Sequence, residues 1–295
     1  MNIKSKAETL FYLSKKLKNF EVSEMFFFDV NDWKKDKDKI IKIIQKKFDR
    51  KEIIIRSSAT DEDTLERSSA GKYLSFLNIK TNKVQSVKHK INLVIESFEK
   101  NKNFLKNKIL IQEMINGIKM SGVVFTSDIA TNLPYYTINY DDVSGLTDTV
   151  TSGYGKYSNK SIFILKNKIN LIKSERFRNL IKCVKEVEEA ISNIPLDIEF
   201  AMKSRKKFYL FQARPLIVKN STNRKLLRKF NSFLKFTYLK LDKKFKKSKD
   251  LMGKKTLFGQ MPDWNPAEMI GLHPSVLAYS LYIELITKSS WLHAR

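Results

Sequence analysis

Two segments of this sequence place charged side chains beside hydroxyl or amide groups at spacings that could bind an anion. In the first, residues 53–58, three isoleucines lead into Arg56, Ser57 and Ser58. We expect a buried strand that stops at Arg56 and presents the planar guanidinium at its exposed end. Such a cation, with the hydroxyl of Ser57 and nearby backbone N–H groups, suits phosphate oxygens. An ordinary polar loop could have the same composition, so both interpretations stay open at this point.

The second segment is a predicted β-hairpin over residues 196–213, with its turn at residues 203–206. Alternation along a strand puts Asp197 and Glu199 on one face, and Gln212 and Arg214 share a face in the same way. If the strands pair, two carboxylates, an amide oxygen and a guanidinium meet on one patch. The oxygens suit Mg²⁺, and the arginine could neutralise charge on a transferred phosphoryl group. The alternative is a surface ladder of salt bridges across the hairpin.

A third segment carries chemistry less distinctly. The apolar strand predicted over residues 109–112 leads into Gln112, Glu113 and Met114. The backbone there could form a hinge that bonds the edge of an adenine ring. A plain core strand explains the same pattern.

The elements that must position these residues predict an α+β fold, because the helices and strands do not alternate regularly. Apolar residues at helical spacing predict helices over residues 5–18, 40–48, 84–98 and 177–191. Besides the strand at residues 52–55 and the hairpin, short strands are predicted at residues 109–112, 122–126, 135–140 and 161–165.

The composition changes after residue 218 to lysine, leucine and phenylalanine without a strand pattern. We expect a nucleotide-binding domain over residues 1–218, a basic helical connector over 219–258 and the start of a further region over 259–295. The connector could instead be an arm for a membrane or a nucleic acid. Residues 259–270 predict a fixed loop, and a helix is expected from Ser275. The chain ends within that apolar pattern, which favours a fragment.

Composition limits the remaining classes of function. The net charge is +25, and 46 lysines and 10 arginines make up the 56 basic residues. Because the lysines are spread over all segments, we expect solvated faces and at most a weak affinity for polyanions, with no specific nucleic-acid partner. We expect no membrane partner, since no apolar run is long enough to span a bilayer and no signal peptide is visible. The single cysteine, Cys183, is expected in a helix core and favours the cytoplasm.

The order of five motifs resembles a known family. They are Arg-Ser-Ser-Ala at residue 56, Ile-Gln-Glu-Met at 111, Ser-Gly-Val-Val-Phe-Thr at 121, Asp-Ile-Glu-Phe at 197 and Phe-Gln-Ala-Arg-Pro at 211. In this order they are similar to the ATP-binding domain of the phosphoenolpyruvate synthase and pyruvate phosphate dikinase family, over about residues 4–217. The resemblance implies an ATP-grasp fold, in which two α+β lobes close on ATP and Mg²⁺.

The resemblance also implies a role for each matched residue. Lys6 and Arg56 would bind phosphates, and Gln112, Glu113 and Met114 would lie at the adenine hinge. Glu199 and Gln212 would bind the metal and phosphates, while Arg214 would support transfer. Residues 136–150 depart from the metabolic enzymes and, with residues 261–271, are similar to a branch that includes L-glutamine kinases.

In that family a histidine on a swivelling domain carries the phosphoryl group. His89, His273 and His293 match no such motif, so the resemblance implies a phosphohistidine domain and an acceptor-binding domain outside this sequence. We therefore expect an ATP-dependent phosphotransferase module. The alternatives are a catalytically incomplete fragment of such an enzyme and a lysine-rich polyanion-binding protein.

Overall fold

The chain divides into two compact units, Met1–Leu227 and Arg228–Arg295, in the computed structural model. The structure describes residues 5–59, 63–64, 67–68, 74–98, 104–145, 160–191, 194–218, 224–245 and 266–291. Predictions that concern residues 60–62, 69–71, 146–150, 261–265 and His293 lie outside the described residues.

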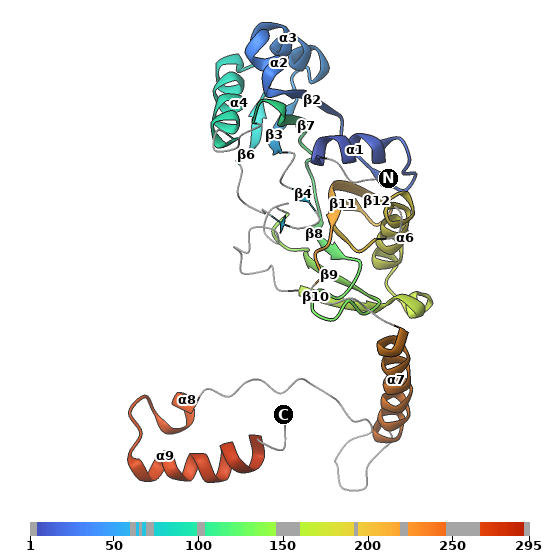
Figure 1. The fold of residues 1–295 in the computed structure, drawn as a ribbon, viewed down its shortest axis with the longest axis vertical. Helices are drawn as coiled ribbons and strands as arrows, with labels where there is room; N and C mark the ends of the chain where they lie inside the picture. Colours follow the sequence, from blue (N-terminus) through green and yellow to red (C-terminus); the bar gives the residue numbers. More distant parts are fainter. Residues whose placement is uncertain are drawn as a thin grey trace. The chain divides into compact units, whose positions relative to one another are not determined.

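The first unit mixes helices and strands in the irregular order that the sequence predicted (Figure 1). Its helices are α1 (Lys6–Ser14), α2 (Val30–Lys35), α3 (Lys37–Lys47), α4 (Val84–Phe98) and α6 (Glu175–Ala190), with short 3-10 turns η1 (Phe104–Lys106) and η2 (Lys166–Leu171). Its strands are β1 (Phe20–Glu21), β2 (Met25–Asp29), β3 (Glu52–Ser58), β4 (Asp63–Thr64), β5 (Arg67–Ser68), β6 (Ser75–Lys80), β7 (Lys108–Glu113), β8 (Met120–Phe125), β9 (Tyr135–Asp141), β10 (Lys160–Leu165), β11 (Leu196–Ser204) and β12 (Lys207–Pro215). The prediction of an α+β fold is confirmed.

A four-stranded antiparallel sheet in the order β2-β7-β3-β6 forms what we call the four-stranded lobe. Helices α2, α3 and α4 pack on one face of this sheet (Figure 1). Ile53 and Ile55 of β3 and Ile109 and Ile111 of β7 lie in that core, each fully buried. The other face therefore carries the alternate residues of β3 and β7.

A six-stranded sheet in the order β1-β12-β11-β8-β9-β10 forms what we call the six-stranded lobe. Its core lies against α1 and α6, which contribute Leu10, Leu13, Leu180 and Val184. Leu110 of β7 also belongs to this core, although its strand is in the other sheet. Helix α1 therefore packs against both lobes and joins them.

A β-bulge in the hairpin decides which residues of β12 face away from the core. The register passes from Glu199 opposite Gln212 to Phe200 opposite Leu210, so Phe211 is an extra residue. Leu210 and Ala213, on either side, both lie in the core. The bulge thus places both Phe211 and Gln212 on the face away from it.

Two predicted elements differ in length from those observed. The helix expected over residues 5–18 ends at Ser14, because the backbone N–H groups of Lys18 and Asn19 donate to Glu186 on α6 instead. The strand expected to stop at residue 55 continues to Ser58, since its last residues pair with β7. The prediction that Arg56 lies at the exposed end of a strand was therefore wrong: it lies within the ladder.

The second unit is helical in its described residues. It holds most of α7 (Arg224–Phe245), then α8 (Pro266–Ile270), α9 (Val276–Tyr282) and a π-helical segment η3 (Ile283–Trp291). The helix predicted from Ser275 is confirmed, with Ser275 capping α9 by accepting from the N–H of Ala278 at 3.2 Å. Residues 266–270, expected in a loop, form a helix that starts at Pro266, where a proline is well tolerated.

We predict that Gly122→Ala destabilises the six-stranded lobe. A Cβ at Gly122 would collide with the backbone of β9, lying 2.8 Å from Cα of Tyr140 and closer still to the carbonyl oxygen of Asn139. We expect a loss of about 1–3 kcal/mol in unfolding free energy, since the two strands must separate. At about 2–4 °C per kcal/mol, thermal denaturation would detect it.

The control is Ser161→Thr, which adds a methyl group at an exposed position of β10 in the same sheet. The analysis of Gly122 is contradicted if both variants melt with the wild type.

Candidate active site

The side chain of Arg56 links the two lobes. Its Nη1 donates to the carbonyl oxygen of Phe211 at 3.0 Å and to Oε1 of Gln112 at 3.5 Å. Its Nη2 lies 3.3 Å from Oε2 of Glu199. Arg56 and Glu199 are only 14% and 19% exposed, so this contact is shielded from much of the solvent. Residues that are far apart in sequence therefore meet at one guanidinium.

Gln112 holds Arg56 from within the four-stranded sheet. The side chain is buried, and its Nε2 donates to Oγ of Ser23 at 3.4 Å while its Oε1 accepts from Arg56. The side-chain amide of Gln112 therefore lies on the face of the sheet that carries Arg56.

The hairpin brings the four predicted side chains into two cross-strand pairs. Glu199 lies opposite Gln212, and Asp197 lies opposite Arg214. Nε and Nη2 of Arg214 both donate to Oδ2 of Asp197, at 2.9 and 2.7 Å. Since neighbouring pairs on one sheet face are within reach of each other, the four groups form one polar patch.

Asp197 is the most buried charged group in this patch, at 7% exposure. Burial raises the pKa of its carboxyl, while the nearby Arg214 acts in the opposite direction. Its second oxygen, Oδ1, is buried and has no hydrogen-bond partner among the described residues. The pair with Arg214 therefore compensates only part of the cost of burying this carboxylate.

The donor set fits a hard cation that completes its shell with ligand oxygens. Glu199 supplies a carboxylate and Gln212 an amide oxygen, and both are of the type that Mg²⁺ binds. Within the described part of the chain, no three His, Cys, Asp or Glu side chains gather closely enough to hold a metal alone.

Two further predicted phosphate ligands, Lys6 and Ser57, come from the start of α1 and from β3. Lys6 is buried at the start of α1, and the N–H of the next residue, Ala7, donates to Oγ of Ser58 at 2.9 Å. Alternation along β3 puts Ser57 on the core face with Ile55, away from Arg56. Ser58 lies on the same face as Arg56. Strand alternation would have predicted this if the strand had been expected to reach residue 58.

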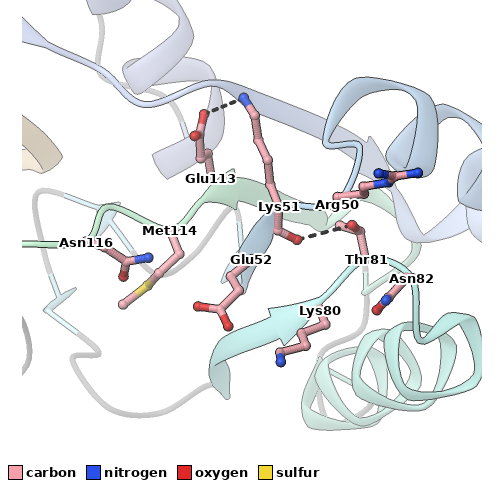
Figure 2. A pocket seen from close by; sticks show the side chains of 9 residues that line it. All are labelled: Arg50, Lys51, Glu52, Lys80, Thr81, Asn82, Glu113, Met114 and Asn116. Atoms are coloured by element: carbon pink, nitrogen blue, oxygen red, sulfur yellow. Dashed lines mark hydrogen bonds and ion pairs between the residues drawn. The ribbon is translucent and has the colours of Figure 1, made fainter.

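The predicted adenine hinge lies at the edge of a hollow of about 560 Å³ (Figure 2). Glu113 turns to one side and pairs with Lys51 at 3.0 Å, whereas Met114 and Glu52 point to the other side. The N–H groups of Glu113 and Met114 already donate to the carbonyl oxygens of Glu24 and Glu52 at 2.9 Å. A base bound here would therefore use other backbone groups or side chains.

The described residues include two histidines, His89 and His273, and both are exposed. His89 lies on α4, which covers the opposite face of the four-stranded sheet from Arg56. His273 lies between α8 and α9 in the second unit. The geometry gives His89 no route to the patch in this conformation.

A family model described as the pyruvate phosphate dikinase AMP/ATP-binding domain matches residues 31–166. The match supports the family that the motifs indicate, and with it an ATP-binding module. It includes Arg56 and Gln112 but ends before Glu199, Gln212 and Arg214. A search of curated proteins found no match.

Several solved structures resemble the chain at low identity. D-alanine–D-alanine ligase from Helicobacter pylori aligns with a TM-score of 0.41 and 10% identity over 72% of this chain and 51% of its own. The VanG D-Ala:D-Ser ligase from Enterococcus faecalis gives 0.41 and 12% over 72% and 52%. The acetyl-coenzyme A synthetase 1 from Ca. Korarchaeum cryptofilum gives 0.44 and 11% over 73% and 94%. The chain thus spans about half the length of the two ligases.

No helix in the described residues combines the length and apolar character needed to cross a membrane.

We predict that Cys183 does not react with thiol reagents in the native protein. It is 2% exposed on α6, and burial raises the pKa of its thiol to about 12, so almost no thiolate forms at neutral pH. Titration with DTNB should detect no reactive thiol in the folded protein and one equivalent of thiol in denaturant. Rapid release without denaturant would contradict the buried, structural role of this cysteine.

Proposed function

We propose that this chain is an ATP-dependent phosphotransferase module of the ATP-grasp type, related to the dikinases, in which the two lobes bind ATP with Mg²⁺ between them. The observation that carries the proposal is the contact of Arg56 with Glu199 and Phe211 beside the Glu199–Gln212 pair. The guanidinium of Arg56, from the four-stranded lobe, thus lies beside Glu199 and Gln212 of the six-stranded lobe, whose oxygens are of the kind that bind Mg²⁺. Phosphate oxygens are the ligand that both can share.

The base would lie further along the same face of the four-stranded sheet. Glu52 and Arg56 are four residues apart on β3, which corresponds to about 13 Å of strand. The hollow is lined by Glu52 and Met114 and therefore lies at that end of β3. We propose that the phosphates lie at Arg56 and the adenine toward this hollow, with the hinge at Gln112, Glu113 and Met114.

Each polar residue then has a distinct part in the proposed reaction. Arg56 and Lys6 would hold phosphates, and Arg214 would bind a phosphate oxygen and neutralise the charge that develops during transfer. Glu199 and Gln212 would hold Mg²⁺, which supplies charge neutralisation to the phosphates when bound. Asp197 fixes the guanidinium of Arg214 by two hydrogen bonds. Catalysis would consist of positioning and electrostatics, without a nucleophile from these residues.

The acceptor would be a histidine outside residues 1–218. Two points support this proposal: His89 lies on α4, which covers the sheet face opposite Arg56, and the family that the motifs resemble uses a swivelling phosphohistidine domain. We propose that this domain and the one that binds the final acceptor, glutamine in the branch that the middle of the chain resembles, belong to another part of the protein or to a second chain. The module would act in the cytoplasm.

We predict that Arg214→Gln weakens ATP binding without unfolding the protein. Glutamine can still donate to Asp197, whereas alanine would leave a buried carboxylate uncompensated. Losing a charged hydrogen bond to phosphate costs about 1.5–3 kcal/mol, or roughly 10- to 150-fold in affinity. Isothermal titration of the protein with ATP in excess Mg²⁺ measures this change.

The matched control is Arg178→Gln on α6, whose exposed guanidinium donates to the backbone carbonyl oxygens of Ile172 and Lys173. It should bind ATP as the wild type does. The proposal fails if the wild type does not bind ATP, or if both substitutions weaken binding equally.

A further inference from the structure

One carboxylate in the proposed site has two competing partners. Oε2 of Glu199 lies 3.3 Å from Nη2 of Arg56, and the same side chain faces Gln212 across the hairpin. A divalent cation at Glu199 and Gln212 would therefore lie close to the guanidinium. The metal ion and the guanidinium would repel each other strongly, because solvent is partly excluded there.

The other contacts of Arg56 keep the guanidinium in place. Its Nη1 is held by the carbonyl oxygen of Phe211 and by Gln112, which Ser23 holds in turn. The Phe211 carbonyl belongs to the bulged residue of β12, and the pairing of β12 with β1 ends at Tyr209. The arginine is therefore fixed from both lobes, and a metal ion alone offers it no new acceptor.

A nucleotide changes this balance because its phosphates carry negative oxygens for both cations. The guanidinium can exchange Glu199 for a phosphate oxygen, and the metal can then take Glu199 and a second phosphate oxygen. We propose that Arg56 restricts this site to the metal–nucleotide complex and excludes the free metal ion. This inference rests on the proposed function and assigns Arg56 a selective role in addition to phosphate binding.

The role implies a coupling between the two ligands. The nucleotide raises the affinity for the metal, and by linkage the metal raises the affinity for the nucleotide by the same factor. Removing the positive charge at position 56 should therefore change the two affinities in opposite directions. If Arg56 only held phosphate, or only supported the fold, its replacement would not strengthen the binding of free metal.

The test uses Mn²⁺ as a probe, with its free concentration followed by electron paramagnetic resonance in the absence of nucleotide. Arg56→Gln keeps a donor for Phe211 but removes the charge, and it should bind Mn²⁺ at least about tenfold more tightly than the wild type. The same variant should bind Mn²⁺–ATP at least about tenfold more weakly. Arg178→Gln should leave both affinities unchanged.

Two further variants keep the test decisive. Adding Glu199→Gln to Arg56→Gln should return free Mn²⁺ binding to the wild-type level, which places the gained site at Glu199. Arg56→Lys keeps the charge and should leave free Mn²⁺ binding weak, even if Arg56→Gln does not fold. The inference is overturned if Arg56→Gln gains no affinity for Mn²⁺, or if Arg56→Lys gains it. In either case a wild type that binds ATP leaves the proposed function standing, whereas a wild type that does not bind ATP removes the proposed function itself.

Discussion

The contact between Arg56 and Glu199 is the interaction on which the proposed site depends. It joins a strand of the four-stranded sheet to a strand of the six-stranded sheet, and the carbonyl of Phe211 adds a second bond to the same guanidinium. Removing one partner of such a shielded pair would leave a charge with poor compensation. The contact therefore links the two lobes, and it marks the place where we propose that phosphate oxygens bind.

The polar faces of both sheets exist because the opposite faces are occupied. Isoleucines of β3 and β7 are buried under α2, α3 and α4, so the alternate positions are left for Arg56 and Gln112. In the hairpin, the core takes Leu210 and Ala213, and the bulge between them leaves Phe211 and Gln212 outward. Strand alternation, interrupted once, thus explains most of the composition of the site.

Much of this site could be predicted from the sequence because strand parity is a local property. The pairing of Glu199 with Gln212 and of Asp197 with Arg214 follows from two alternating strands and a short turn. The side of β3 on which Ser57 lies was not anticipated, because the strand was expected to stop before it. Contacts such as that of Arg56 with the Phe211 carbonyl join distant segments through tertiary packing, which no local pattern specifies.

A crystal structure of the protein with Mg²⁺ and a non-hydrolysable ATP analogue would test the central claim most directly. The account predicts phosphate density between Arg56 and the Glu199–Gln212 pair, with the guanidinium moved from Glu199 onto phosphate oxygens. It also predicts the base near Met114 and Glu52. Nucleotide bound away from both sheets, with Arg56 still paired to Glu199, would contradict the account.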